Sequence, residues 1–174
     1  MKRASAASPG LSLKARAIAL LAQREHSSAE LRRKLLRLAQ QIALARVDDE
    51  ALPASPPDEE AVAEEVDALL AWLQAQGYLD EARFVESRVH ARSGRWGQQR
   101  IAQELAQHGL SLSAEQREAL AASELERARD IWQHKFGGQV PVTPADKARQ
   151  LRFLLGRGFS AALVQRLWRS TSDE

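Results

Sequence analysis

Cysteine is absent from the 174-residue chain, which excludes disulfide bonds, thiolate zinc sites and cysteine nucleophiles. A chain without cysteine suits a reducing compartment, so we expect a cytoplasmic protein. Aromatic residues make up only 5% of the sequence, and most of its apolar content is Ala and Leu. Because Ala, Leu, Arg, Glu and Gln are strong helix formers, this composition predicts an all-α fold.

Long apolar runs are also missing. The longest uncharged apolar stretch, residues 17–23, is far shorter than the roughly 20 residues that a transmembrane helix needs. The N-terminal segment starts with basic residues, but Pro9, Gly10, Lys14 and Arg16 interrupt any apolar core of a signal peptide. We therefore expect no contact with a membrane.

The sequence has no recognisable catalytic or metal-binding pattern. Its four histidines are scattered, with no pair at the i, i+4 spacing of zinc proteases, and no serine lies in a nucleophile-elbow motif. The acidic pairs Asp48-Asp49 and Glu59-Glu60 are explained by a solvated loop and by the preference of helix N-termini for acids. No glycine-rich phosphate loop occurs. The sequence therefore predicts no enzymatic activity, no metal site and no cofactor.

Start and stop signals divide the chain into nine short helices. Serine or threonine precedes several apolar runs, often with Glu or Gln three residues later, and glycine follows several of them. Proline and acidic residues make residues 47–58 a break in the pattern. The predicted spans include 13–24, 28–43, 59–76, 98–108 and 161–169, with further helices beginning after Asp80, Ser113, Ser123 and Thr143.

Two segments of the chain resemble each other. QQRIAQELAQHGLS aligns with DKARQLRFLLGRGFS when Gly109 is placed on Gly158, and SSAELRRKLLRLA aligns with the first of them at a larger offset. The spacing predicts three tandem three-helix repeats that form an elongated, curved molecule. We expect a flexible tail at 1–12, repeat 1 at 13–79 with an acidic, proline-rich insertion at about 40–58, repeat 2 at 80–122 and repeat 3 at 123–170.

Charge is distributed unevenly, although the formal net charge is only +2. Residues 51–81 contain eight acidic and no basic residues, whereas residues 1–50 contain ten basic and five acidic residues. Separate basic and acidic segments indicate contact with a polyanion or a charged protein surface. Basic residues recur on or beside the middle helix of each repeat, and with one tryptophan they are the candidate contact residues: Arg24, Arg32, Arg33, Lys34, Arg37, Arg88, Arg92, Arg95, Trp96, Arg100, Arg149, Arg152 and Arg157.

The tryptophan in this set has two interpretations. Trp96 lies next to Arg95 and close to Arg100, so its ring is able to stack on a nucleic-acid base or on a partner's surface. It is equally able to fasten its loop to the core of the repeat, which is the interpretation that we favour.

Four segments in the same order resemble the RecX family, the bacterial regulators of the RecA recombinase. They are AIALLAQREHSSAELRRKLL, WLQAQGYLDEARFVESRV, RWGQQRIAQELAQHGLS and DKARQLRFLLGRGFS. The resemblance covers about residues 13–169, and its most specific parts are REHSSAELRRKL, GYLDEARF and LRFLLGRGFS. The segment from Gln40 to Asp58 is longer than the short glycine-containing link that is typical of the family, and we expect it to be a disordered, dispensable loop.

The resemblance implies a monomer of three tandem three-helix repeats without enzymatic activity. It also implies a role in recombination, DNA repair and the SOS response. Members bind in the helical groove of the RecA–single-stranded DNA filament, and they inhibit the ATPase, strand-exchange and coprotease activities and limit filament growth. The candidate residues above would then contact RecA or DNA, through interactions that weaken as salt increases.

Two other functions fit the residues. A helical-repeat protein that binds single- or double-stranded DNA directly is one of them, because a three-helix unit also describes helix-turn-helix domains. The three copies and the lack of a clustered base-reading set argue against it. A protein-interaction scaffold is the other, and it would have no affinity for DNA.

Overall fold

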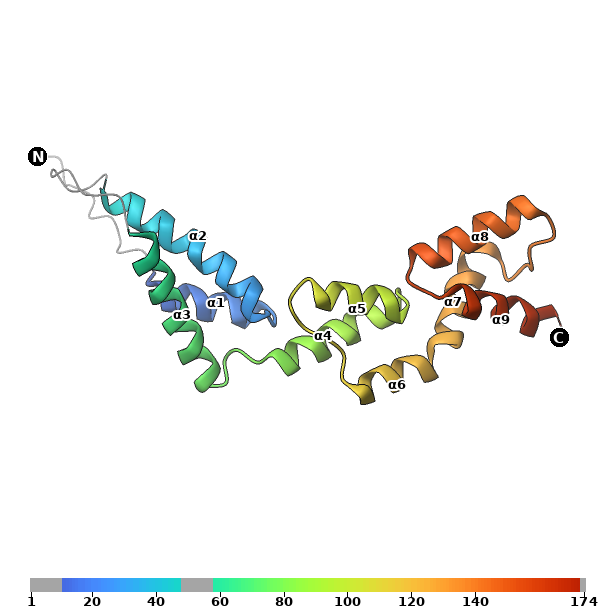
Figure 1. Cartoon of the computed structure of the whole chain (residues 1–174), viewed down its shortest axis with the longest axis horizontal. Helices are drawn as coiled ribbons and strands as arrows, with labels where there is room; N and C mark the ends of the chain where they lie inside the picture. Colours follow the sequence, from blue (N-terminus) through green and yellow to red (C-terminus); the bar gives the residue numbers. More distant parts are fainter. Residues whose placement is uncertain (1–10, 48–57, 173–174) are drawn as a thin grey trace, which may run out of the picture. The chain divides into compact units, whose positions relative to one another are not determined.

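A computed structural model describes residues 11–47 and 58–172 (Figure 1). These residues form nine α-helices and no strand, which confirms the predicted all-α fold built from three-helix units. No helix in these ranges combines the length and apolar character needed to cross a bilayer. The helices are α1 (Leu13–Gln23), α2 (Ser28–Val47), α3 (Glu59–Ala75), α4 (Glu81–Ser93), α5 (Gln98–Ala106), α6 (Ala114–Ala122), α7 (Glu124–Phe136), α8 (Pro144–Gly156) and α9 (Ala161–Ser172).

Polar side chains cap several helices as the sequence predicts. The Ser113 hydroxyl accepts the N–H of Gln116 at 3.0 Å, and the Gln116 side chain accepts the N–H of Ser113 at 3.0 Å, which completes a capping box. Thr143 caps α8, with Pro144 at its first position. Gly109 and Gly158, which the repeat alignment pairs, both adopt positive φ (+74° and +85°) where the chain turns after α5 and α8.

Three predicted helix ends differ most from the structure, while α1, α3 and α5 end one or two residues earlier than predicted. Ser123 does not cap α7 with its side chain, because it belongs to the α6–α7 turn with helical φ and ψ (−96°, 0°) and its hydroxyl donates to backbone carbonyls of α6. α2 continues to Val47 instead of ending near Ala43, since residues 43–47 contain no helix breaker. α9 likewise continues to Ser172 instead of ending near Arg169.

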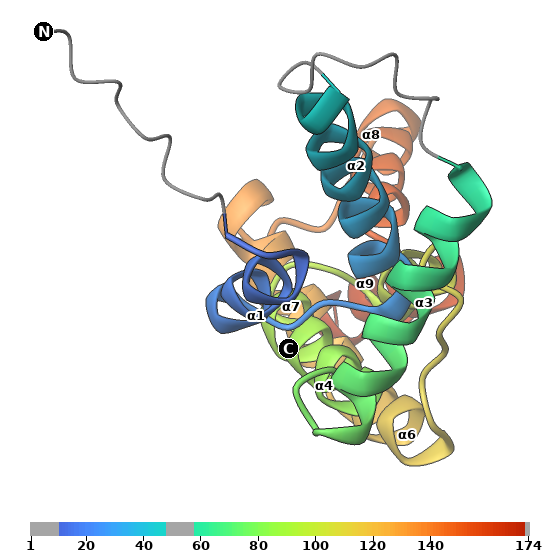
Figure 2. The same ribbon diagram turned by 90° about the vertical axis from the view of Figure 1, so that its left-hand side faces the viewer.

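The chain divides into two compact units, one ending at Glu81 and the other beginning at Ala82. In unit 1, α2 and α3 pack side by side and α1 packs against α2 (Figures 1 and 2). The apolar residues that face inward recur three or four positions apart, so each helix buries one stripe. The fully buried members of this core are Ala17, Leu31, Leu35, Val66 and Leu73.

Unit 2 contains α4–α9 and has two separate cores. The first lies among α4, α5 and α6, and the second lies among α7, α8 and α9. Each buried leucine, isoleucine or phenylalanine side chain contributes about 1.5–3 kcal/mol to stability. The first core contains Phe84, Val85, Ile101, Leu105, Leu112 and Leu120, and the second contains Ala128, Trp132, Leu154, Phe159, Val164, Leu167 and Trp168.

Backbone contacts join the two parts of unit 2. The N–H of Gly97 donates to the carbonyl of Arg157 at 2.8 Å. A Cβ on Gly97 would lie 2.3 Å from the carbonyl oxygen of Gly158, and a Cβ on Gly158 would lie 2.6 Å from the backbone nitrogen of Arg100. Neither glycine therefore leaves room for a side chain. We call this contact the glycine junction.

A half-buried arginine supports the glycine junction from α7. Arg127 donates to the carbonyls of Ser93 and Trp96, both at 2.9 Å, and to that of Leu120 at 2.8 Å. Its burial lowers the pKa of the guanidinium group. Glu124 adds a further contact by accepting the N–H of Gln98 at 2.8 Å. The loop between α4 and α5 is therefore fixed to α7 by hydrogen bonds to its backbone.

Two predictions about flexible segments fall largely outside the described residues. Of the tail predicted at 1–12, the structure describes only Leu11 and Ser12, and the Ser12 hydroxyl caps α1. Of the insertion predicted at about 40–58, residues 40–47 belong to α2 and Asp58 caps α3. The remainder of both segments lies outside the described residues.

Candidate functional site

The basic residues at the start of α2 bind a carboxylate of their own unit. Glu30 forms ion pairs with Arg24 and with Lys34, the latter at 3.3 Å. Burial alone would raise the pKa of Glu30, but the hydrogen bonds from Arg24 and Lys34 bring it down to about 2. Two of the predicted contact residues therefore share one carboxylate inside unit 1, which leaves one net positive charge for the three side chains.

A buried histidine belongs to the same cluster. His26 is 1% exposed, its Nδ1 lies 3.0 Å from the carbonyl of Arg24, and its Nε2 lies 3.0 Å from Nζ of Lys34. With these partners, Nδ1 carries the proton and Nε2 accepts from the lysine. Burial lowers the pKa of His26. The REHSSAEL motif therefore builds the α1–α2 corner, where Ser27 also accepts the N–H of Glu30 at 3.1 Å.

The remaining candidates on α2 differ in their partners. Arg32 forms a two-pronged ion pair with Asp67 of α3, with distances of 2.6 and 2.8 Å. This hydrogen bond lowers the pKa of the Asp67 carboxyl. Arg33 and Arg37 are exposed on α2 and lie on the solvent side of the helix. Within unit 1, these two arginines are the candidates whose charge is most available to a partner.

Two candidates on α4 share one carboxylate. Glu104 of α5 accepts from Arg88 at 3.3 Å and from Arg92 at 3.0 Å. Arg88 also lies over the ring of Phe84, with its guanidinium carbon 5.1 Å from the ring centroid. These contacts fasten α4 to α5 and leave one net positive charge for the three side chains.

A different arrangement surrounds the tryptophan that follows α4. Trp96 is half-buried and packs against the first core of unit 2. Arg100 lies over its ring at 4.5 Å, and Arg157 at 5.4 Å. Arg157 also donates to the carbonyl of Arg95 at 3.2 Å, while Arg100 donates to that of Gly156 at 3.4 Å. Four of the predicted residues thus come together at the glycine junction, where the arginine side chains contact rings and carbonyls.

The cluster continues along α8 to the end of α7. Arg157 also lies 4.9 Å from the ring of Phe153, whose centroid is 5.3 Å from that of Phe136 in an edge-to-face arrangement. Arg149 lies 5.8 Å from the Phe136 ring. Cation–π pairs form within about 6 Å, so each of these neighbours interacts with the next. We call this set the cation–aromatic row: Arg100, Trp96, Arg157, Phe153, Phe136 and Arg149.

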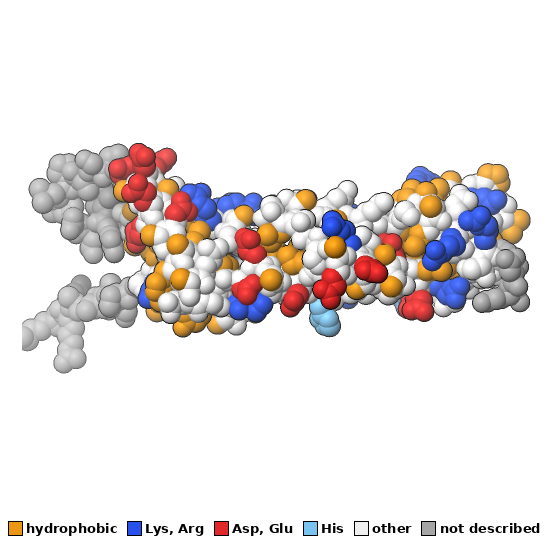
Figure 3. Space-filling view, turned by 60° about the horizontal axis from the view of Figure 1, so that its bottom comes forward, with side chains coloured by type: hydrophobic (Ala, Val, Ile, Leu, Met, Phe, Trp, Pro, Cys, Tyr) orange, Lys and Arg blue, Asp and Glu red, His pale blue; other side chains and the backbone are white. Residues whose placement is uncertain are grey.

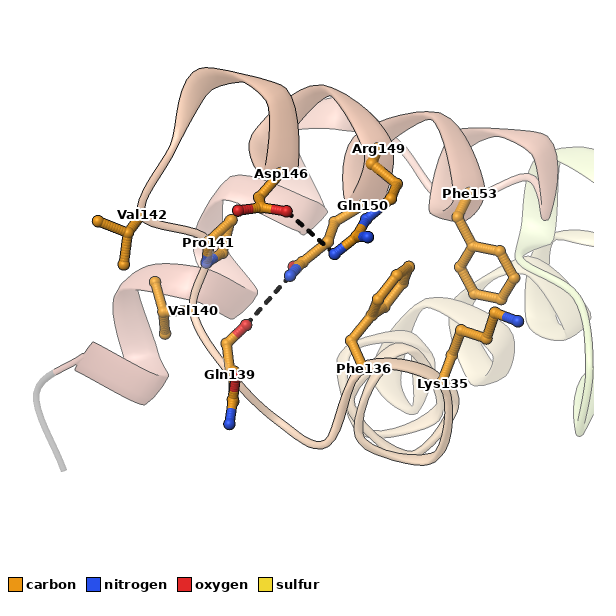
Figure 4. Close-up of a pocket in the computed structure, with 10 residues that line it drawn as sticks. All are labelled: Lys135, Phe136, Gln139, Val140, Pro141, Val142, Asp146, Arg149, Gln150 and Phe153. Atoms are coloured by element: carbon orange, nitrogen blue, oxygen red, sulfur yellow. Dashed lines mark hydrogen bonds and ion pairs between the residues drawn. The ribbon is translucent and has the colours of Figure 1, made fainter.

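A pocket lies at the end of the row, between α7, the loop that follows it and α8 (Figure 4). Phe136 and Phe153 line one side of it, and Lys135 lies beside the Phe153 ring, at 5.9 Å from its centroid. Val140 and Pro141 line the other side. The pocket thus combines an apolar lining with cations at its rim.

The last candidate on α8 stays apart from the row. Arg152 is exposed, and its Nε donates to the carbonyl of Ala148 in its own helix at 3.3 Å. On the face drawn in Figure 3, Lys and Arg side chains gather with hydrophobic ones over the end of unit 2 formed by α7–α9, whereas acidic side chains lie over its middle. No group of three or more His, Asp or Glu side chains in the described ranges is placed to hold a metal ion.

Sequence reasoning missed three members of this site. Lys135, Phe136 and Phe153 were not among the predicted contact residues. A pattern in the sequence does indicate part of the arrangement, because Arg149, Phe153 and Arg157 are four residues apart and so share one face of a helix. The contact between Arg157 and Trp96 has no local pattern, since it joins residues about sixty positions apart.

Comparisons with known proteins agree with the repeats. A family model for the second three-helix domain of RecX matches residues 80–114, and one for the third matches residues 122–168. The chain is 43% identical over 159 residues to the regulatory protein RecX of Ralstonia nicotianae, covering 90% of this chain and 86% of that protein.

Other relatives carry the same name. The regulatory protein RecX of Leptothrix cholodnii is 43% identical over 168 residues, with 95% of this chain and 93% of that protein covered. That of Escherichia coli is 35% identical over 166 residues, with 91% and 90% covered. The chain belongs to the RecX family of regulatory proteins.

Proposed function

We propose that this protein is a non-enzymatic inhibitor of the RecA recombinase. In this role it binds in the groove of the RecA–single-stranded DNA filament, suppresses ATPase, strand-exchange and coprotease activities, and limits filament growth. It acts as a monomer in the cytoplasm. The family to which it belongs, whose members are named regulatory proteins, supports this role.

The observation that carries the proposal is the cation–aromatic row. Arg100 and Arg157 are held in position by rings and backbone carbonyls, which leave their positive charge uncompensated. An anionic partner is therefore attracted to side chains that are already ordered, and less conformational entropy is lost on binding. A filament that contains a DNA strand offers such a partner, because its phosphates repeat along the groove.

The test is the DNA-dependent ATPase activity of RecA. We expect the protein to inhibit ATP hydrolysis by RecA on single-stranded DNA in moderate salt, and the inhibition to weaken as salt increases. An absence of inhibition at an amount equal to that of RecA would show the proposal to be wrong.

Direct binding to DNA is the second candidate, because the same row suits free phosphates. This function would make the protein reduce RecA activity only by competing for DNA. Excess single-stranded DNA would then restore the ATPase fully. If the protein acts on the filament, a preformed filament remains sensitive to it when no free DNA is present.

A further inference from the structure

The pocket at the end of the row has an amphipathic lining. Phe136, Val140 and Pro141 provide apolar surface, and Lys135 and Arg149 are exposed at the rim. A ligand with a planar apolar group and an attached anion would match both the apolar lining and the cations at the rim. Val142, which is 89% exposed, extends the apolar surface outward.

The polar groups of the pocket are already engaged. Asp146 is the one carboxylate of the lining, and it accepts from Arg149 at 3.0 Å and from the Thr143 hydroxyl at 2.8 Å. Gln150 is buried, accepts from Trp132 at 2.7 Å and donates to the carbonyl of Gln139 at 3.1 Å. Few polar side-chain groups of the pocket are therefore free to form hydrogen bonds that distinguish one ligand from another. The pocket recognises its ligand by shape and charge.

The row repeats one pairing of a cation with a ring. It occurs with Arg100 on Trp96 at 4.5 Å, Arg157 on Phe153 at 4.9 Å and Arg149 on Phe136 at 5.8 Å. A ligand that suits such a surface repeats an anion and a planar apolar group. Single-stranded nucleic acid has this pattern, whereas an acidic peptide supplies carboxylates without regularly spaced planar groups.

We propose that the pocket between α7 and α8 is a subsite for one nucleotide of a single strand, bound without sequence preference. The base lies against Phe136, Lys135 contacts its phosphate, and the strand continues along the row toward Trp96. This inference deepens the proposed function, on which it rests for the source of the strand, by naming where unit 2 contacts DNA.

The test compares two fluorescent oligomers of equal length, oligo(dT) and the same backbone with abasic units. We expect the full-length protein to bind oligo(dT) more tightly. Phe136→Leu keeps apolar bulk but removes the ring, so it should weaken oligo(dT) binding about fivefold and leave abasic binding unchanged. Equal weakening of both, or of neither, overturns the proposal.

Lysine variants supply the matched control. Lys135→Gln and Lys147→Gln each remove one exposed positive charge, but only Lys135 lies at the pocket. We expect Lys135→Gln to reduce the slope of log Kd against log salt concentration by the amount that corresponds to about one phosphate contact. Lys147→Gln should change this slope far less. Equal effects mean that only the general charge of the protein matters, which also overturns the proposal.

A third variant keeps the test decisive if Phe136→Leu disturbs folding. Val142 is exposed at the pocket rim, so Val142→Asp adds a negative charge there with little effect on the core. It should weaken oligo(dT) binding severalfold, and unchanged binding contradicts the subsite.

Failure of the subsite and failure of the proposed function give different results. If the protein inhibits RecA but binds both oligomers equally well, the subsite is wrong and the proposed function stands. If it shows the base-dependent binding and the expected variant effects but leaves RecA unaffected, the subsite is supported and the proposed function is wrong.

Discussion

Two groups of basic side chains, one in unit 1 and one at the glycine junction of unit 2, are held in different ways. In unit 1, Arg24 and Lys34 share the carboxylate of Glu30, and Arg32 is paired with Asp67. In unit 2, Arg100 and Arg157 rest on aromatic rings and bind backbone carbonyls. The difference teaches that a basic stretch of sequence does not by itself mark a binding surface. What matters is whether a carboxylate or a neutral group holds the cation.

The units also differ in how their helices are held together. Unit 1 has a single core between three helices. Unit 2 has two cores, and the glycine junction connects them through the backbone. Four predictions test these two contrasts, and they run from the largest expected effect to the smallest.

Replacement of Gly97 should have the largest effect. A Cβ there would meet the backbone of Gly158 at 2.3 Å, so Gly97→Ala must displace one part of unit 2 and should cost about 2–3 kcal/mol. Amide hydrogen exchange should become faster in α5 and α8 and stay unchanged in α2. Gly94→Ala is the matched control, because its Cβ would meet no atom within 4 Å. Similar losses in both variants would show that the junction does not stabilise unit 2.

Removal of cations from the row should have the next largest effect. Arg100→Gln combined with Arg157→Gln should raise the concentration needed to inhibit the RecA ATPase at least about tenfold, since two charge-assisted contacts are lost. The matched pair, Arg24→Gln with Arg32→Gln, removes the same charge from unit 1 and should change inhibition much less. An equal effect of the two pairs would contradict the contrast between the units.

Acid should destabilise unit 1 through Glu30. Its carboxyl has a pKa of about 2 in the folded chain and 4.5 as an ordinary glutamate, so the unfolded state binds more protons between these values. The stabilisation is therefore present above pH 4.5 and is lost as the pH falls toward 2. We expect a loss of about 1 kcal/mol after solvent screening.

The measurement is urea unfolding of the wild type and of Glu30→Gln across this pH range. The variant should lack this part of the pH dependence, and an identical slope in both proteins would rule out the contribution. The buried His26 adds a second loss of stability, which begins at a higher pH than that of Glu30. Because burial lowers the pKa of His26 in the folded chain, the unfolded state binds the proton more readily as the pH falls below 6.5.

The smallest expected effect concerns two serines, Ser27 and Ser123, which each precede a glutamate by three residues. Ser27 accepts the N–H of Glu30 at 3.1 Å, whereas Ser123 makes no such cap. Ser27→Ala should therefore cost about 0.5–1 kcal/mol, and Ser123→Ala only a few tenths. Thermal unfolding of the two variants checks the difference. If Ser123→Ala proves as costly, the hydrogen bond that its hydroxyl accepts from Arg127 at 3.3 Å matters more than the cap.

Much of the fold was predictable because its signals are local. Capping serines, prolines at helix starts and glycines after helices act within a few residues, and Ser113, Thr143 and Gly158 behave as expected. The predicted cap at Ser123 was wrong because a single residue separates α6 from α7. No residue with an extended backbone is then left to cap α7. A sequence signature alone does not show how closely the next helix follows.

Only part of the site was predictable from the sequence. Arg95, Trp96, Arg100, Arg149 and Arg157 stand out as basic residues around an aromatic one. Their assembly depends on contacts between distant parts of the chain, such as that between Trp96 and Arg157. The ion pairs of Arg24 and Lys34 depend on Glu30, which the sequence indicates only as half of a capping box. The roles of all these residues in binding remain predictions.

The glycine junction has a consequence for genetics. When two side chains clash, a smaller residue at the second position relieves the clash. Many second-site suppressors arise in this way. At Gly97 the opposing atoms belong to the backbone, and at Gly158 they are the Cβ and the backbone of Arg100, so a smaller residue across the contact still leaves backbone atoms too close. We expect revertants of either variant to restore glycine itself. A chimera that takes repeat 2 from one relative and repeat 3 from another should fold only if each parent supplies its own glycine.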